Sequence, residues 1–318
     1  MPEPDQPVHP EDCARTTARA MWERLEPLHA VTYFSDEAAQ AAAQAGYRGF
    51  WMGYFACRLA PLGAVGPEIA TAVCFGFDPG RVARALPDAW TFAPPQMALN
   101  ARQAGAAAAL SRICGAAEGL DEAADLAWEA SQLAGCEGRV LAAANQALPR
   151  PSDPWGVLWQ AATTLREHRG DGHNAALVAA AVSPTQAHWL KIAAQETDPN
   201  PLQVSRNWSA QSWQDGRSEL QQRGWLNAAS TLTDAGHAAH QDIESRTDHA
   251  AGSPWHRLGI EATGRLADLL APLTRAVLDS DTIPFPNPVG LNKLGTSDVP
   301  RESELPLTED CVRRARRG

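Results

Sequence analysis

Apolar residues recur three or four positions apart along most of the chain, which is the pattern of helices that each bury one face. Much of this pattern is carried by alanine, so that neighbouring helices can pack at short distances. We predict no strand in residues 13–150. Helices are predicted in this half over residues 14–28, 35–46, 95–114, 121–133 and 138–148, with shorter ones opening at Pro67 and at Pro79.

Several of the predicted helices begin with a capping side chain followed by proline. Asp78-Pro79, Asp153-Pro154 and Ser183-Pro184 have this form, in which the side chain accepts a hydrogen bond from the first turn and proline fills a position that needs no donor. Pro149-Arg150-Pro151 acts in the opposite sense, because proline disfavours helical geometry in the residue before it. The clearest internal boundary is therefore predicted near residue 150.

The helix predicted from Asp153 changes character along its apolar face. Arg166 and Arg169 continue the stripe that its apolar side chains form. A guanidinium on such a face needs a carboxylate, a carbonyl or an anionic ligand as a partner. This end of the helix is therefore expected to leave the core or to meet a polar pocket. The apolar members of the stripe are Trp155, Leu158, Trp159, Ala162 and Leu165.

The segment Arg166-Glu167-His168-Arg169-Gly170-Asp171-Gly172-His173 is the most chemically dense part of the chain. Its two glycines predict a turn between one helix and a second helix over residues 173–182. Such a turn would let the nitrogen and oxygen ligands of the segment converge on Zn²⁺, Fe²⁺ or Mn²⁺. The candidate metal ligands are Glu167, His168, Asp171 and His173.

Two other uses of this segment remain open. In a structural use, Asp171 caps the following helix and Glu167 pairs with a neighbouring cation. In a haem site, His29, His168 or His173 would be the axial ligand. The cofactor is thus unknown, with a divalent metal or haem as the alternatives.

A second candidate region is the aromatic segment 46–58, in which glycines recur among bulky rings. It predicts either a tight helix contact or one wall of a ligand pocket. We expect the pocket to be bounded by residues 29–58 and 166–173. The candidate ligand-binding residues are His29, Tyr33, Tyr47, Trp51, Tyr54, Arg58, Arg166 and Arg169.

The order of motifs after residue 183 resembles the winged-helix domain of MarR-type proteins. A capped helix is followed by a helix over residues 209–222, by Arg223-Gly224-Trp225-Leu226, and by Leu232-Thr233-Asp234-Ala235-Gly236, which opens a helix through Asp248. The resemblance implies a recognition-type helix that ends at a glycine, a wing of two short strands between residues 224 and 232, and a terminal helix that packs on the body or pairs two subunits as a homodimer.

A wider resemblance covers about residues 15–291. The phrases LHAVTYF, GYRGFWMGYFACRLAPLG, REHRGDGH, RGWL with LTDAG, and FPNPVGL occur in this order. With them the chain resembles an actinobacterial family of helical proteins labelled helix-turn-helix. Membership implies an all-helical body with the winged helix appended, and it implies no particular activity.

The expected division follows from these patterns. The fold class is all-α, with a multi-helix body and a C-terminal MarR-like winged helix that carries a short β wing. The expected parts are a mobile leader (1–11), a helical domain (12–150), a helical hairpin (151–182), the winged-helix module (183–250), a terminal helix (251–280) and an extended tail (281–318).

Composition narrows the classes of function. The chain has 318 residues, 44% apolar residues and a formal net charge of −10. It is therefore expected to fold, without general attraction to nucleic acid or an anionic membrane. Its six cysteines stand singly, and no apolar run approaches the length of a membrane span, which predicts reduced thiols, a cytoplasmic location and no membrane insertion. The sequence contains no phosphate-binding loop, no Gly-x-Ser-x-Gly turn and no cysteine pair. Nucleotide hydrolysis, serine hydrolysis and iron–sulfur chemistry are therefore disfavoured.

These observations favour a small-molecule- or metal-binding protein, with an enzyme left open, in which the winged helix serves structure or protein contact. The alternative is a DNA-binding transcriptional regulator in which Arg217 and Arg223 touch DNA. Residues 183–250 hold five basic and eight acidic residues, a net of −3, whereas a duplex binder neutralises several phosphates. Nucleic acid is therefore the less favoured partner.

Overall fold

The computed structural model describes residues 10–194 and 199–291. Within these ranges the chain forms helices joined by loops and contains no strand, so the all-α prediction is confirmed for them. The predicted basic tail and nearly all of the predicted leader lie outside the described residues. In chain order the elements are α1 (Pro10–Phe34), α2 (Asp36–Gln44), α3 (Gly49–Leu59), the short 3₁₀ helix η1 (Ala60–Leu62), α4 (Pro67–Val73), α5 (Pro79–Ala83), α6 (Ala89–Phe92), α7 (Pro95–Cys114), α8 (Leu120–Leu133), α9 (Val140–Gln146), α10 (Pro154–Ala179), α11 (Pro184–Ala193), α12 (Pro199–Arg206), α13 (Ala210–Gln222), α14 (Asp234–Ala250), α15 (Ser253–Leu258) and α16 (Ile260–Asp279).

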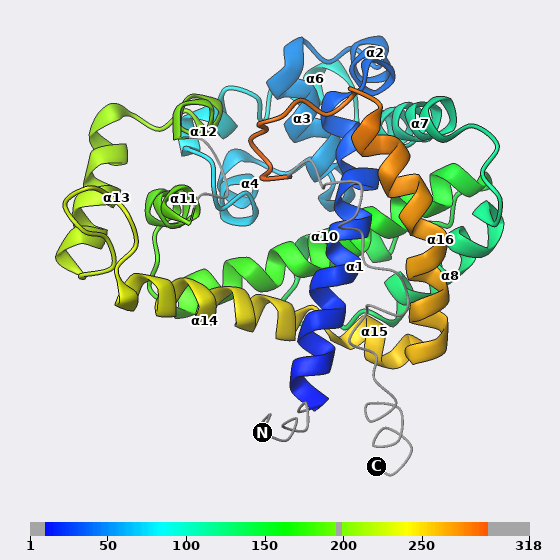
Figure 1. Cartoon of the computed structure of the whole chain (residues 1–318). Helices are drawn as coiled ribbons and strands as arrows, with labels where there is room; N and C mark the ends of the chain where they lie inside the picture. The colour runs from blue at the N-terminus through cyan, green and yellow to red at the C-terminus, as the bar shows by residue number, and fades with distance from the viewer. Residues whose placement is uncertain (1–9, 195–198, 292–318) are drawn as a thin grey trace, which may run out of the picture.

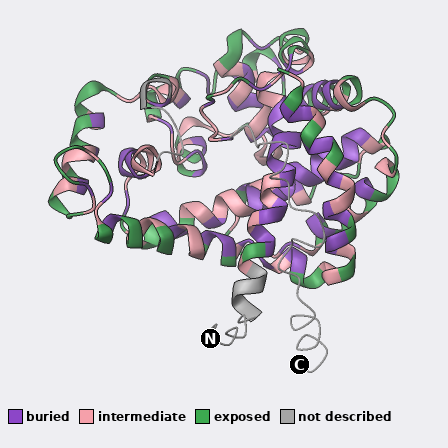
Figure 2. Cartoon of the chain, in the orientation of Figure 1, coloured by how far each residue is buried: buried purple, intermediate pink, exposed green. Residues whose placement is uncertain are grey.

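Buried apolar side chains form three clusters, and α10 contributes to two of them. The first cluster gathers α1, α7, α8, α10, α15 and α16 around residues such as Met21 and Trp159. The second gathers α3 to α6 with α7 and α9 around Phe55. The third joins the C-terminal end of α10, through Leu177, to α11, α12, α13 and α14. Figure 1 shows α11 to α13 on one side of the molecule and α7, α8 and α16 on the other, with α10 and α14 between them, and Figure 2 shows the purple, buried positions along the inner faces of these helices.

The predicted caps at helix starts are present. Ser35, Asp78, Asp153 and Ser183 each accept a hydrogen bond from a backbone N–H in the first turn of the helix that follows. Ser183 and Gln186 form a complete capping box. These short-range predictions are confirmed because a cap depends on residues only a few positions apart.

The predicted hairpin over residues 151–182 is wrong, because α10 runs through both glycines without a break. Gly172 serves close packing: a Cβ added there would lie 2.6 Å from Arg139 Nη1 and 3.3 Å from the Cβ of Ala250. Arg139 donates hydrogen bonds to the carbonyl oxygens of His168 and, at 2.7 Å, Ala250. The missing side chain thus lets an arginine tie α10 to the end of α14.

Two other helix boundaries differ from those predicted. The first helix continues past His29 to Phe34, because Pro27 interrupts only its own donor and the apolar stripe goes on. His29 and Tyr33 are thereby neighbours one turn apart. The terminal helix is broken at Gly259, whose φ of +89° is unfavourable for other residues. It forms α15 and α16 in place of one helix.

The predicted β wing between residues 224 and 232 is also wrong. This interval holds a single antiparallel bridge between Leu226 and Leu232, and the described residues contain no strand. The turn is closed by the side chain of Asn227, whose Oδ1 accepts from the Thr231 N–H at 3.1 Å. The chain is too short here for a ladder, since Gly224 is still part of the turn that ends α13.

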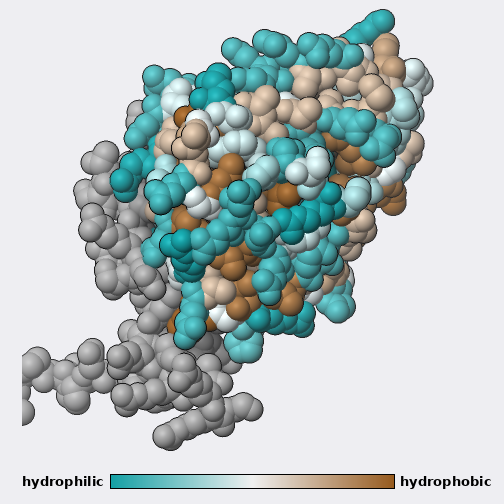
Figure 3. All heavy atoms as spheres, turned by 90° about the vertical axis from the view of Figure 1, so that its right-hand side faces the viewer, coloured by the Kyte–Doolittle hydropathy of each residue, from teal (hydrophilic) through white to brown (hydrophobic). Residues whose placement is uncertain are grey.

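On the outer face formed by α7, α8 and α16, hydrophilic and hydrophobic areas are interspersed (Figure 3). Exposed ion pairs such as Arg265 with Glu122 connect α16 to α8 on it. No helix in the described ranges has both the length and the apolarity that a membrane crossing requires.

Candidate functional site

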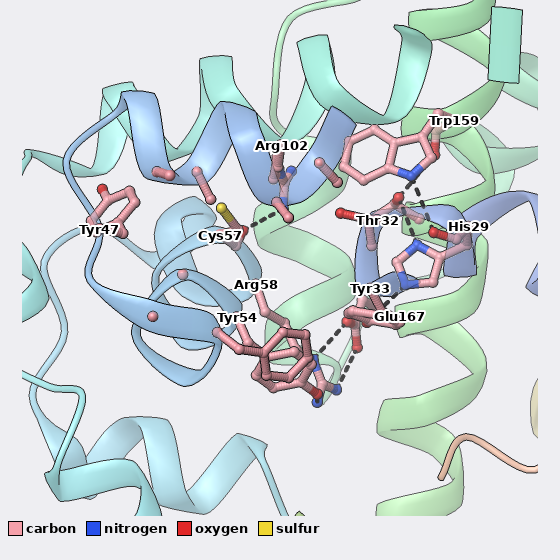
Figure 4. A pocket seen from close by; sticks show the side chains of 18 residues that line it. His29, Thr32, Tyr33, Tyr47, Tyr54, Cys57, Arg58, Arg102, Trp159 and Glu167 are labelled. Atoms are coloured by element: carbon pink, nitrogen blue, oxygen red, sulfur yellow. Dashed lines mark hydrogen bonds and ion pairs between the residues drawn. The ribbon is translucent and has the colours of Figure 1, made fainter. Parts of the chain in front are cut away.

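A cavity of about 280 Å³ lies between α1, α2, α3, α7 and α10, close to the lower end of the range for small-molecule pockets, roughly 300–1,000 Å³. We call it the aromatic pocket; Figure 4 shows its side chains. Exposed residues at its rim, among them Ala43, Gly49 and Phe50, bring it to the surface. Helix α2 forms an alanine wall that sits close to α7, because a Cβ on Gly105 would lie 2.7 Å from the Cα of Ala38. The lining residues are His29, Thr32, Tyr33, Ala38, Ala39, Ala42, Ala43, Tyr47, Gly49, Phe50, Gly53, Tyr54, Cys57, Arg58, Arg102, Trp159, Thr163 and Glu167.

His29 is buried at one end of the aromatic pocket, and its tautomer follows from its neighbours. The Thr163 hydroxyl donates to the carbonyl oxygen of Trp159 at 2.8 Å, so it accepts from His29 Nδ1 at 2.9 Å. Nε2 of His29 is then the acceptor for the Tyr33 hydroxyl, also at 2.9 Å. Burial, followed by the nearby charge of Arg166, holds the pKa of His29 well below its ordinary 6.5, so the ring is neutral.

A buried ion-pair cluster lies at the same end of the aromatic pocket. Arg58 binds Glu167 through two hydrogen bonds, Nε to Oε1 at 3.0 Å and Nη2 to Oε2 at 3.1 Å, and donates a third to the Tyr54 hydroxyl at 3.1 Å. Nη1 of Arg166 lies 3.1 Å from the same Glu167 carboxylate. Although burial opposes ionisation, the two guanidiniums lower the pKa of Glu167 to about 2. This carboxylate is therefore ionised and already neutralises Arg58.

Arg102 is the other cation that lines the aromatic pocket, and its partners are neutral. It is only 4% exposed. It donates to the Cys57 carbonyl oxygen at 3.2 Å, to Asn145 Oδ1 at 2.8 Å and to Gln160 Oε1 at 3.1 Å. No carboxylate of the described residues lies within ion-pair distance of it. Burial lowers the pKa of Arg102 to about 10, and it remains a buried cation at neutral pH.

The structure brings together five of the eight predicted ligand-binding residues. His29, Tyr33, Tyr47, Tyr54 and Arg58 line the aromatic pocket, although the Tyr47 hydroxyl donates to the Ala93 carbonyl oxygen at 3.3 Å.

The other three predicted ligand-binding residues lie elsewhere. Trp51 packs beside Phe55 and Phe77 in the second cluster. Arg166 contacts the Glu167 carboxylate but does not line the aromatic pocket. Arg169 points to α14, where its Nη2 donates to Asp248 Oδ1 at 2.7 Å.

The four predicted metal ligands do not converge, so that prediction is wrong as a cluster. On one continuous helix their side chains diverge, and among the described residues no group of three or more His, Cys, Asp or Glu side chains could hold a metal ion. Glu167 faces Arg58. His168 Nε2 donates to the Gly135 carbonyl oxygen at 3.0 Å, Asp171 accepts from the Ala142 N–H at 3.0 Å, and His173 Nδ1 donates to the Thr247 hydroxyl at 2.9 Å.

The remaining expectations for the 166–173 segment change accordingly. Asp171 caps the first turn of α9 and not the helix that follows it in sequence. His168 and His173 face away from the aromatic pocket, whose lining includes neither. Both ring nitrogens of His29 are engaged by Thr163 and Tyr33, so this geometry does not present it as an axial haem ligand.

The two residues predicted to touch DNA are engaged within the chain. Arg223 donates to the carbonyl oxygens of Ala181 and Ala180 at 3.0 and 3.2 Å, at the end of α10, and its guanidinium stacks on Trp225. Arg217 lies over the Trp189 ring. The exposed positions of α13 are alanine, glutamine, aspartate and glutamate residues, with no lysine or arginine among them.

Arg102, Trp159 and Thr163 were missed as site residues. Trp159 was assigned to a core stripe, which is correct for most of its surface. Arg102 had a usable signal: it is the single basic residue in the alanine-rich stretch 98–110 and would fall on the buried side of that helix.

The comparisons with known proteins place the chain in a family without adding a ligand. No curated protein and no solved structure matches it. Residues 18–284 match a family described as a helix-turn-helix family, a range that takes in all the helices from α2 to α16 and most of α1. The chain therefore belongs to this helix-turn-helix family.

Proposed function

We propose that the protein binds a small carboxylic acid with an apolar, ring-sized body in the aromatic pocket. The observation that carries the proposal is Arg102, a buried cation on the pocket wall whose partners are all neutral. An arginine has five N–H donors, and the three hydrogen bonds of Arg102 leave donors for a ligand. A carboxylate would supply both the missing charge and matching acceptors.

The other residues that line the aromatic pocket determine the size and apolar character expected of the rest of the ligand. The alanines of α2, the ring of Trp159 and the rings of Tyr54 and Phe50 offer apolar and aromatic surface, against which a ring would stack. Arg58 is a weaker anchor than Arg102, because Glu167 already neutralises it. The ligand's charged end is therefore placed at α7 and its apolar body towards α2 and α3.

Isothermal titration calorimetry with a series of benzoate, phenylacetate and longer aryl carboxylates tests this proposal. Each acid is paired with its amide, which keeps the shape and removes the charge. We expect carboxylates to bind at least about tenfold more tightly than the amides, because hydrogen bonds to a charged group are worth roughly 1.5–3 kcal/mol. Equal binding of acids and amides, or no binding by any acid of the series, would overturn the proposal.

Two matched pairs of variants locate the site. Arg102→Gln should abolish the preference for acids, whereas Arg112→Gln, an exposed arginine on the same helix, should keep it. Ala39→Phe should fill the pocket mouth and prevent binding, whereas Gln40→Phe, next to it but outside the pocket lining, should not. Circular dichroism of each variant separates lost binding from lost folding.

A second candidate function, a DNA-binding regulator, is favoured by the family match alone. The charge of the 183–250 segment and the acidic and amide side chains on the exposed face of α13 argue against it. Fluorescence anisotropy with random duplex DNA at about 150 mM salt tests whether the protein binds DNA directly. Binding no tighter than roughly 10⁻⁴ M rejects direct DNA contact, while a salt-dependent affinity of 10⁻⁶ M or better supports it.

A further inference from the structure

A second cavity, of about 200 Å³, lies where α11 and α12 meet α3 and α10. We call it the basic cavity, because four cations line it and its lining contains no aspartate or glutamate. The cations come from four different helices, α3, α10, α11 and α12. They are Arg58, Arg166, Lys191 and Arg206.

The carboxylates behind the lining leave this cavity positively charged. Glu167 pairs with Arg58 and Arg166, and Glu26 Oε1 lies 3.5 Å from Arg166 Nε. Four cations less these two carboxylates give a charge of +2. Lys191 and Arg206 have no ion-pair partner among the described residues.

Among these four cations, Arg206 is the one whose positive charge is least compensated by its neighbours. Its guanidinium stacks on the Phe77 ring at 4.2 Å, and Nη2 donates to the Pro288 carbonyl oxygen at 3.0 Å. Its Nε is buried with no hydrogen-bond partner in the described part of the chain. Burial lowers the pKa of Arg206, and the charges of Arg58 and Arg166 lower it further. A buried cation with an unused donor and no carboxylate partner is costly, so an anion in the cavity beside it would be stabilising.

Two histidines also line the basic cavity, and neither supplies a negative charge. His188 Nε2 donates to the Gly76 carbonyl oxygen at 2.8 Å, and burial, with Arg206 and Lys191 nearby, lowers its pKa to about 3. His173 donates through Nδ1 to Thr247. Both rings therefore add hydrogen-bonding surface without cancelling charge.

The segment that carries the FPNPVGL motif closes one side of the basic cavity. Pro288 and Val289 line it, and the Asn287 side chain bonds both the N–H and the carbonyl oxygen of Leu291, at 3.0 and 2.9 Å, to fix the turn. Figure 1 shows this stretch, after α16, crossing back over the body towards α4. The motif thus helps to enclose the basic cavity. None of its residues lines the aromatic pocket.

We propose that the basic cavity binds a phosphate-class oxyanion, either inorganic phosphate or the phosphate group of a small metabolite. A tetrahedral dianion matches the charge of +2 and offers acceptors in several directions, as cations arriving from four helices require. Its binding would tie α11 and α12 to α3 and α10, because each of these helices contributes one cation. The basic cavity shares Arg58 and Tyr54 with the aromatic pocket, but the two anchors differ: Arg102 lines only the aromatic pocket, and Arg206 lines only the basic cavity.

Calorimetry and thermal melting in phosphate test the proposal. Titration of the full-length protein with sodium phosphate, at constant ionic strength held with chloride, should give saturable binding of one anion per chain and a saturable rise in Tm. Glycerol 3-phosphate is titrated in parallel: tighter binding than inorganic phosphate identifies a metabolite phosphate, and tighter binding of inorganic phosphate identifies the free ion. Absence of saturation with both overturns the proposal.

Variants test whether the heat measured in the phosphate titration arises from binding in the basic cavity. Arg206→Gln and Lys191→Gln should each weaken phosphate binding about tenfold or more. Arg246→Gln, at an exposed arginine of α14 that pairs with Asp242, should leave phosphate binding unchanged. If Arg206→Gln does not fold, Lys191→Gln, at a partly exposed position, decides alone. Arg102→Gln should retain phosphate binding, so failure of the carboxylate proposal and failure of this one are distinguishable.

Discussion

Arg58 and Glu167, 109 residues apart in sequence, form a two-bond ion pair with N–O distances of 3.0 and 3.1 Å. Arg58 lines both the aromatic pocket and the basic cavity. The pair therefore stands at the boundary between the two. The Glu167 side chain is 2% exposed and that of Arg58 13% exposed, so the pair is largely removed from water.

The two members of this pair should differ in their effect on stability. Glu167→Gln leaves Arg58 and Arg166 without their shared carboxylate and should cost about 3–5 kcal/mol. Arg58→Gln should cost less, about 1–3 kcal/mol, because Arg166 still pairs with Glu167. Urea denaturation of both variants measures the difference. Equal losses, or a larger loss for Arg58→Gln, would contradict the role given to Arg166.

Acid should destabilise the protein through His168 before most carboxylates titrate. Burial, together with the charge of Arg139, lowers the pKa of His168 from 6.5 to about 4. Because the folded-state pKa is the lower one, the unfolded chain binds the proton first. The contribution of the neutral ring is full above pH 6.5 and is lost as the pH falls towards 4, by about 3 kcal/mol.

The variant His168→Gln isolates this contribution. Glutamine can still donate to the Gly135 carbonyl oxygen and does not titrate. Urea midpoints measured from pH 7 to pH 4 should fall more steeply for the wild type than for the variant. Parallel curves would show that His168 is not the group responsible, and His29 and His188, which are also held neutral, would be examined next.

Gly170 and Gly172 should respond in opposite ways to alanine. A Cβ on Gly170 meets only ordinary contacts at 3.7 and 3.9 Å, so Gly170→Ala should stabilise α10 by up to about 1 kcal/mol. Gly172→Ala should cost about 1–2 kcal/mol, because Arg139 must leave the carbonyl oxygens of His168 and Ala250. Thermal melting compares the two. Stabilisation by both would mean that Arg139 moves aside freely.

Arg223 should act as a cap for α10. Its two hydrogen bonds to the carbonyl oxygens of Ala180 and Ala181 satisfy groups that the helix end leaves open. Arg223→Ala should lower the free energy of unfolding by about 1 kcal/mol, and Arg217→Ala serves as a comparison at a position with no such bonds. Loss of DNA binding in Arg223→Ala without any loss of stability would favour the regulator instead.

The fold could be predicted from the sequence where its determinants are local. Ser183 and Gln186 form their capping box from residues three apart, and the proline starts need even less context. Gly172 shows where local inference stops: the same glycine suits a turn or a close approach, and only Arg139 and Ala250, distant in sequence, decide between them.

The sequence allowed several residues of the candidate site to be predicted, but not the partners with which they interact. His29 and Tyr33 could be picked out as polar groups among rings, yet the Thr163 hydroxyl that sets the His29 tautomer lies 134 residues away. Glu167 was predicted either to bind a metal or to pair with a neighbouring cation; it pairs with its neighbour Arg166, but its two-bond partner Arg58 comes from another helix. Such pairings depend on how α1 and α3 cross α10, which no periodicity encodes.

The unbroken course of α10 has a mechanical consequence. Thr163 lies beside the aromatic pocket and Leu177 lies in the cluster that supports α11 to α14, so one stiff rod of about 21 Å joins them. A tilt of about 5° at the pocket end would move the far end by about 2 Å, the size of the helix shifts seen in allosteric transitions. With no hinge at its glycines, α10 can act as a lever between the aromatic pocket and the helices α11 to α14.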